Sequence, residues 1–201
     1  MNENPNAPTV LVVFGATGDL MARKIVPSLA YLKVKGRLPE KFRVIGFSRR
    51  DWSDDDLRDH VITILDAYEG TALADAEREA FLGMFTYQRG TFDDAAAYAA
   101  LADDIAAIDD SWDLCASKLY YLAVPPENYR IIFQRLADSG LTEGCGDGVG
   151  FTRVLVEKPF GADGATAQEL DELLGSLFAE EQVYSIDHYL SKEMLQGIQS
   201  F

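Results

Sequence analysis

The stretch TVLVVFGATGDL, residues 9–20, decides the fold of this chain. Its first half is a short, continuous apolar run rich in β-branched side chains, which is typical of a strand buried on both faces. Gly15 closes the run, Gly18 follows, and apolar residues at helical spacing begin directly afterwards. The stretch therefore predicts a buried strand, a tight glycine turn and the start of a helix.

The same alternation of strand and helix continues along the chain. Strands are expected at residues 9–15, 42–48, 84–92, 118–124, 152–158 and 183–187, and helices at 19–38, 53–68, 93–108, 126–138, 163–178 and from 192. Pro27 predicts a kink or break in the first helix, Gly36 predicts its end, and Ser53 predicts a helix cap. These repeated βαβ units predict an α/β fold of the Rossmann type, a mostly parallel sheet with helices on both faces.

The overall composition argues against two classes of function. The chain has 201 residues with 33 acidic and 18 basic side chains, and its net charge of −15 repels a nucleic-acid backbone. No apolar run approaches the ~20 residues that span a bilayer, and the polar N-terminus is unlike a signal peptide. Cys115 and Cys145 lack metal-type spacing. We therefore expect a soluble, cytoplasmic protein without metal, nucleic-acid or membrane partners.

The glycine turn has the position of a dinucleotide-binding loop. Gly15 allows the chain to turn sharply off the strand, and Gly18 allows the backbone to approach a pyrophosphate at the helix N-terminus. A plain strand–helix turn is the alternative interpretation of the two glycines.

The end of the second expected strand indicates which dinucleotide is bound. The sequence there is GFSRRD, residues 46–51, whereas NAD-binding folds usually carry Asp or Glu at this point for the adenine ribose. Arg49, with Arg50 beside it, offers a planar cation that can hold a 2′-phosphate through two hydrogen bonds. The pattern favours NADP over NAD, with Ser48 as an additional donor. Two solvated surface arginines are the alternative.

Four separated stretches carry a family resemblance. They are FGATGDLMARKIVPSL (14–29), LYYLAVPPENY (119–129), VLVEKPFG (154–161) and IDHYLSKE (186–193). Together, and in this order, they resemble the N-terminal, coenzyme-binding domain of the glucose-6-phosphate dehydrogenase family. The resemblance implies oxidation of glucose 6-phosphate to 6-phosphogluconolactone with transfer of hydride to NADP, the entry step of the pentose phosphate pathway.

The resemblance also implies roles for individual residues. The cofactor-binding set is Gly15, Ala16, Thr17, Gly18, Asp19, Leu20, Met21, Ala22, Arg49, Arg50, Tyr121, Pro125 and Lys158. The substrate-binding set is Lys24, Lys158, His188, Tyr189 and Lys192, and the catalytic set is Asp187 and Lys158. Asp187 is the partner of a histidine base, and Lys158 lies between coenzyme and sugar.

That histidine base lies in a later domain of the family, and this sequence contains only His60 and His188. We therefore expect a truncated chain, with a disordered tail at 1–9, an NADP-binding domain at 10–186 and the start of a substrate domain at 187–201. Such a chain is expected to bind NADP without turnover, and a homo-oligomer is expected only for the full-length protein. The alternative is a non-catalytic NADP-binding sensor or partner subunit. A short-chain reductase is disfavoured because no Tyr-x-x-x-Lys pair is present.

Three positions depart from the family pattern. Met21 stands where a third small residue of the turn usually lies, which would hold the helix away from the strand unless Ala22 takes that place. Ser185 replaces an arginine, and Ser191 replaces a glycine.

Overall fold

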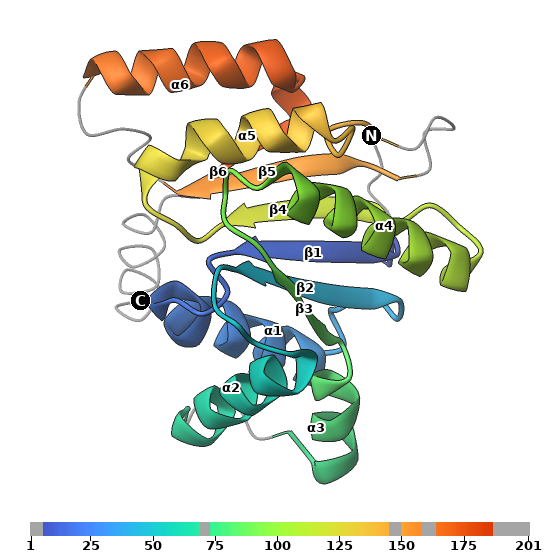
Figure 1. Ribbon diagram of the computed structural model, residues 1–201. Coiled ribbons are helices and arrows are strands. Elements are labelled where there is room, and N and C mark those ends of the chain that lie inside the picture. The colour runs from blue at the N-terminus through green and yellow to red at the C-terminus, as the bar shows by residue number, and fades with distance from the viewer. Residues whose placement is uncertain (1–5, 69–72, 145–149, 158–163, 187–201) are drawn as a thin grey trace, which may run out of the picture.

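The computed structural model describes residues 6–68, 73–144, 150–157 and 164–186. Within these ranges six parallel strands form one sheet in the order β3-β2-β1-β4-β5-β6 (Figure 1). The strands are β1 (Thr9–Phe14), β2 (Phe42–Ser48), β3 (Phe85–Arg89), β4 (Ser117–Leu122), β5 (Thr152–Glu157) and β6 (Val183–Ile186). The predicted Rossmann-type α/β fold is confirmed.

The strand order reverses beside β1, which pairs with β2 on one side and with β4 on the other. The loops that leave β1 and β4 therefore run to opposite faces of the sheet, and a crevice opens between them at the carboxyl ends of the strands. Those ends lie together at the left of Figure 1. This edge is where a ligand site is expected in an open parallel sheet.

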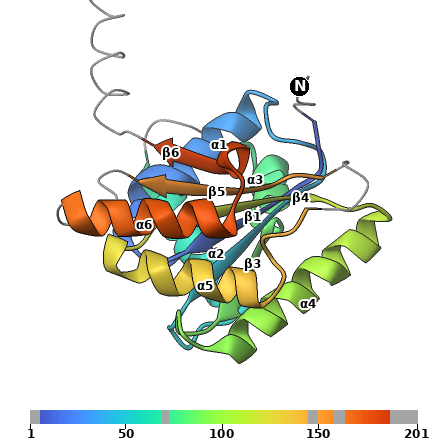
Figure 2. The same cartoon turned by 90° about the horizontal axis from the view of Figure 1, so that it is seen from above.

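Helices cover both faces of the sheet. They are η1 (Met21–Ile25), α1 (Val26–Val34), α2 (Asp54–Ala67), α3 (Asp75–Leu82), α4 (Ala95–Trp112), α5 (Tyr129–Asp138) and α6 (Gly164–Leu177), with short 3-10 turns η2 (Pro126–Asn128) and η3 (Glu180–Gln182). Figures 1 and 2 show α1, α2 and α3 on one face and α4, α5 and α6 on the other. None of the helices in the described ranges is long and apolar enough to cross a membrane.

The side chains of β1 divide between two cores, one on each face. Val10, Val12 and Phe14 pack into the core beneath α4, α5 and α6. Leu11 and Val13 pack into the core beneath α1, α2 and α3. Because successive side chains of a strand point to opposite faces, a strand covered on both sides must be apolar throughout.

The first helix contains a π-helical turn, η1, immediately before Pro27. The backbone N–H of Val26 donates to the carbonyl of Met21, five residues back. Proline has no N–H and its ring crowds the carbonyl four residues earlier, so a wider turn accommodates it without ending the helix. The predicted irregularity at Pro27 is confirmed. Helix α1 ends at Val34, two residues before Gly36, which has a φ of +61°.

Two expectations about the region around β3 were wrong. Helix α3 was not predicted; within it only Phe81 is buried, so its sequence carries little apolar periodicity. The third strand was expected to run to residue 92 but ends at Arg89. It ends there because Gly90 packs against α4, where an added Cβ would lie 2.3 Å from the Cβ of Ala97.

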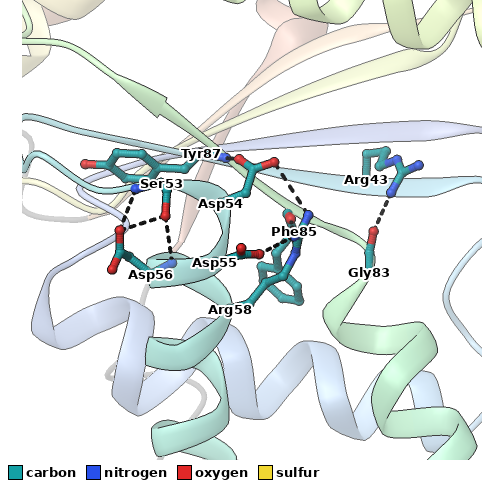
Figure 3. Close-up of polar contacts among 9 residues, drawn as sticks. All are labelled: Arg43, Ser53, Asp54, Asp55, Asp56, Arg58, Gly83, Phe85 and Tyr87. Atoms are coloured by element: carbon teal, nitrogen blue, oxygen red, sulfur yellow. Dashed lines mark hydrogen bonds and ion pairs between the residues drawn. The ribbon is translucent and has the colours of Figure 1, made fainter.

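Polar contacts fasten the start of α2 to β3 (Figure 3). Ser53 accepts from the backbone N–H of Asp56 at 3.2 Å, and the Asp56 carboxylate accepts from the Ser53 N–H at 2.8 Å, which confirms the predicted cap. Asp54 accepts from the N–H of Tyr87 at 2.7 Å, and Arg58 donates to the carbonyl of Phe85 at 3.2 Å. The start of α2 is therefore capped and held against β3.

Candidate functional site

The glycine turn after β1 presses against the loop that follows β4. Gly15 has a φ of +84°, and its N–H donates to the carbonyl of Phe47 at 2.9 Å. A Cβ at this position would lie 2.5 Å from the carbonyl oxygen of Ala123 and 2.8 Å from Cγ1 of Val124. The N–H of Gly18 donates to the carbonyl of Gly15 at 2.9 Å and closes the turn. Only glycine combines the positive φ with the lack of a Cβ that position 15 requires.

The residues between and after these glycines are divided between core and surface. Ala16 is fully buried against Gly46 of β2, where an added Cβ would lie 2.9 Å from the Ala16 Cβ. Met21 is also fully buried, in the core beneath α1, α2 and α3, and Ala22 packs against the same core. Leu20 is half-buried. The large side chain of Met21 therefore packs inside this core.

The end of β2 brings a hydroxyl and an arginine to this turn. Ser48 is buried, and its Oγ lies 2.9 Å from Oγ1 of Thr17. Arg49 is exposed and lines the same space as Gly15 and Gly18. The guanidinium of Arg50 instead lies 5.3 Å from the centre of the Trp52 ring. The structure therefore places one of the two neighbouring arginines in the site and stacks the other on a tryptophan.

These elements line a cleft of about 700 Å³ at the carboxyl ends of β1, β2, β3 and β4. The lining residues are Gly15, Thr17, Gly18, Ser48, Arg49, Gly90, Thr91, Phe92, Asp93, Ala123, Val124, Pro125, Asn128 and Ile131. This volume lies in the range of sites that bind small molecules and cofactors. Six residues of the sequence prediction line it, namely Gly15, Thr17, Gly18, Ser48, Arg49 and Pro125.

The loop after β3 is the part of the cleft that the sequence analysis missed. Thr91, Phe92 and Asp93 lie opposite the glycine turn, and hydrogen bonds from the Thr91 side chain and from its own backbone keep the pKa of Asp93 below its usual range. A pattern that points to these residues exists, because the carboxyl ends of adjacent parallel strands lie at the same edge of the sheet and β3 pairs with β2. The sequence analysis placed Thr91 and Phe92 in the strand and Asp93 at the start of the next helix, so it did not assign them to the cleft.

A sequence model of the family described as "Glucose-6-phosphate dehydrogenase, NAD binding domain" matches residues 12–197. The chain belongs to this family. A glucose-6-phosphate 1-dehydrogenase 2 from Mycobacterium tuberculosis is 38% identical over 191 residues, covering 95% of this chain and 37% of that protein. The Bacillus subtilis glucose-6-phosphate 1-dehydrogenase is 36% identical over 199 residues, covering 99% and 39%.

Solved structures agree with this membership. A glucose-6-phosphate dehydrogenase in complex with its substrate glucose 6-phosphate superposes with a TM-score of 0.85 at 36% identity, over 98% of this chain and 40% of that one. The Mycobacterium avium enzyme gives a TM-score of 0.77 at 31% identity, over 92% and 37%. The chain spans about two fifths of the length of these glucose-6-phosphate dehydrogenases.

Membership of the coenzyme domain of glucose-6-phosphate dehydrogenase indicates a nucleotide coenzyme, and the cleft fits one. The glycine turn, which has no room for a side chain at Gly15, leads into a helix N-terminus. The partial positive charge there favours phosphate groups. Among the described residues that line the cleft, Arg49 is the single cation. In the described part of the chain, no group of three or more His, Cys, Asp or Glu is placed to hold a metal ion.

The remaining expected site residues of this glucose-6-phosphate dehydrogenase domain lie beside the cleft or beyond the described ranges. Tyr121 faces the core beneath α1, α2 and α3, and its hydroxyl donates to Oε1 of Glu157 at 2.7 Å; burial, followed by this carboxylate, raises its pKa. Asp19 pairs with Arg23 at 2.7 Å, and Lys24 is exposed on η1. Lys158, Asp187, His188, Tyr189, Lys192, Ser191, the tail 1–5 and the helix from 192 fall outside the described residues, and their roles stay predictions.

Proposed function

We propose that this chain binds NADP in the cleft, as the coenzyme-binding part of a glucose-6-phosphate dehydrogenase that converts glucose 6-phosphate to 6-phosphogluconolactone. The observation that carries the proposal is the position of Arg49 in the lining of the cleft that contains the Gly15–Gly18 turn. A diphosphate and a 2′-phosphate are the anions that these two features suit.

The diphosphate would lie against the turn between β1 and the first helix. Helical structure begins at residue 19, so the backbone after Gly18 presents the positive end of a helix to the cleft. The absence of a side chain at Gly18 leaves the backbone there open to close approach. The Thr17 hydroxyl, which also lines the cleft, adds a hydrogen-bonding group at the same place.

The preference for NADP over NAD follows from the charges at the end of β2. Residues 48–50 contain no acid that could accept hydrogen bonds from a bare adenine ribose. The first acid after them, Asp51, is paired with Arg89 at 2.7 Å. Arg49 has no hydrogen bond or ion pair with another described residue, so its guanidinium is available for a phosphate.

NADP, when bound, supplies the acceptor for the hydride that leaves the sugar. Pro125 and Asn128, which follow β4, line the cleft beyond the glycine turn and would bound the nicotinamide side. The sugar phosphate would be held by Lys24, Lys158, His188, Tyr189 and Lys192, with Asp187 as the partner of a base. Several cationic and hydroxyl donors suit a dianionic phosphate.

Isothermal titration with NADP and with NAD tests the proposal. We expect Arg49→Ala to weaken NADP binding by roughly 10- to 100-fold, since a hydrogen bond to a charged group contributes about 1.5–3 kcal/mol, and to leave NAD nearly unchanged. Arg37→Ala is the matched control, because Arg37 is exposed on the loop after α1. Equal affinity of the wild type for the two coenzymes, or equal losses with both, would contradict the 2′-phosphate site.

A second measurement concerns turnover. The sequence contains only His60 and His188, and His60 lies on α2, where it contacts Trp52 and does not line the cleft. General-base catalysis typically supplies about 10²–10⁴-fold of rate. We therefore expect this 201-residue chain to bind NADP without reducing it in the presence of glucose 6-phosphate. Sustained formation of NADPH would refute this expectation.

A further inference from the structure

The backbone that carries Arg49 into the cleft is held from the neighbouring strand. The hydroxyl of Tyr87, on β3, donates to the carbonyl of Ser48 at 3.0 Å and to the carbonyl of Arg50 at 2.8 Å. These two carbonyls stand on either side of Arg49 in the chain. One phenol therefore brackets the residue, with its single proton shared between two acceptors.

Tyr87 is itself fixed at several points. Its backbone pairs with Gly46 in the β2–β3 ladder, and its N–H donates to Oδ1 of Asp54 at 2.7 Å, as Figure 3 shows. Its half-buried ring lies 6.0 Å from the ring of Trp52, the same ring on which Arg50 stacks. The hydroxyl thus projects from a rigid strand and not from a loop.

The side chain of Arg49 has no comparable support. Arg50 is stacked on Trp52 and Arg89 is paired with Asp51, whereas Arg49 makes no hydrogen bond or ion pair with any residue in the described ranges. Among the described residues, the contacts to its backbone are therefore the only support that limits where its guanidinium can reach. A movement of the turn between residues 48 and 50 would carry the guanidinium away from the cleft.

The phenol remains a donor throughout the neutral range of pH. Burial, as the largest effect, raises the pKa of Tyr87 above its ordinary value, while hydrogen bonding and the nearby arginines oppose this. The contact with the two carbonyls therefore does not titrate under the conditions in which coenzyme affinity is measured.

We propose that Tyr87 is a positioning residue for coenzyme selection, whose hydroxyl fixes the backbone on both sides of Arg49 so that the guanidinium is held where a 2′-phosphate binds. The inference rests on the proposed NADP site. A preorganised cation binds more tightly than one that must be ordered on binding, because less conformational freedom is lost. Tyr87 should therefore affect ligands that carry a 2′-phosphate and not those with a bare ribose.

The test compares Tyr87→Phe with the control Tyr31→Phe, because Tyr31 is an exposed tyrosine on α1. The titrated probes are NADP and NAD, together with the fragments 2′,5′-ADP and 5′-AMP. The members of each pair differ only in carrying or lacking the 2′-phosphate. Circular dichroism and the melting temperature verify that each variant is folded. Loss of one net hydrogen bond corresponds to a roughly 3- to 10-fold change in a binding constant.

We expect Tyr87→Phe to weaken the binding of NADP and 2′,5′-ADP by about this factor, while the binding of NAD and 5′-AMP is unchanged. In the Arg49→Ala background the same substitution should have no further effect, because Tyr87 acts through Arg49. Equal weakening of all four ligands, or independent effects in the double variant, would overturn the inference. If the wild type shows no preference for NADP, or if Arg49→Ala leaves that preference intact, the proposed NADP site is wrong. If the wild type and Arg49→Ala behave as proposed but Tyr87→Phe has no effect on binding, only the role of Tyr87 is wrong.

Discussion

The hydroxyl oxygens of Thr17 and Ser48 lie 2.9 Å apart and join the glycine turn after β1 to the end of β2 across 31 residues of sequence. Ser48 is buried and Thr17 faces the cleft. This bond fixes the distance between the diphosphate end and the 2′-phosphate end of the proposed coenzyme site.

Removal of this hydroxyl pair should lower stability and loosen the site. We expect Ser48→Ala to reduce the free energy of unfolding by roughly 1 kcal/mol, which for a domain of this size lowers the melting temperature by about 2–4 °C. Thr17→Val should cost a similar amount, and the double variant should cost less than the sum. Urea denaturation measures all three. Strictly additive losses would show that the two hydroxyls act separately.

The backbone at Gly15 offers a contrast with that at Gly36. Both have positive φ, but an added Cβ at Gly36 meets nothing within 4 Å, whereas at Gly15 it would meet the carbonyl of Ala123 at 2.5 Å. We expect Gly36→Ala to cost about 1–2 kcal/mol from the left-handed conformation alone. Gly15→Ala should cost more and should also weaken NADP binding. Comparable losses of stability in urea would mean that the loop after β4 moves aside freely.

Two buried tyrosines in the core beneath α4, α5 and α6 should change the stability of the protein in opposite directions when the hydroxyl is removed. Tyr120 is fully buried, and its hydroxyl has no hydrogen-bond partner among the residues that the structure describes. An unsatisfied buried group costs about 1–3 kcal/mol, so Tyr120→Phe should stabilise the protein. Tyr129→Phe should destabilise it, because that hydroxyl accepts from the N–H of Glu157 at 3.4 Å. Calorimetric melting of the two variants provides the check, and a loss of stability in Tyr120→Phe would contradict the assignment.

His60 should make stability depend on pH. Burial, and secondarily the charge of Arg50, lower its pKa below the ordinary value of 6.5. Its Nε2 is buried and has no hydrogen-bond partner within the described ranges. The unfolded chain therefore binds the proton more readily, so the stability associated with neutral His60 is complete above pH 6.5 and is lost as the pH falls from there towards the lowered pKa. NMR titration of the ring gives the pKa. Urea denaturation across this pH range should show that the free energy of unfolding of His60→Gln depends less steeply on pH than that of the wild type. An identical slope in the two proteins would exclude His60 as the source of the pH dependence.

Local sequence patterns were sufficient for the framework of the fold. The apolar run at residues 9–14 predicts a strand buried on both faces because such a strand has no polar side. Ser53 and Gly36 predict the limits of helices, since caps and left-handed ends depend on one residue's hydrogen bonding or backbone freedom. The Gly15 turn and Arg49 were recognised for the same reason, because each follows directly from the end of a strand.

Features that depend on another part of the chain were missed. Helix α3 buries little beyond Phe81, so its pattern is weak. Residues 91–93 enter the cleft only because β3 pairs with β2, and the separation of Arg50 from Arg49 depends on Trp52.

By itself, the sequence determined the alternation of strands and helices apart from α3, and the glycine turn. It also placed a pair of neighbouring arginines at the end of β2. These features follow from burial periodicity and from the conformations open to single residues. Tertiary structure alone decided which arginine faces the cleft, that Tyr87 holds its backbone, and that Thr17 meets Ser48. Those contacts join segments 31 to 39 residues apart, and their geometry exists only once the parallel strands have set the register between them.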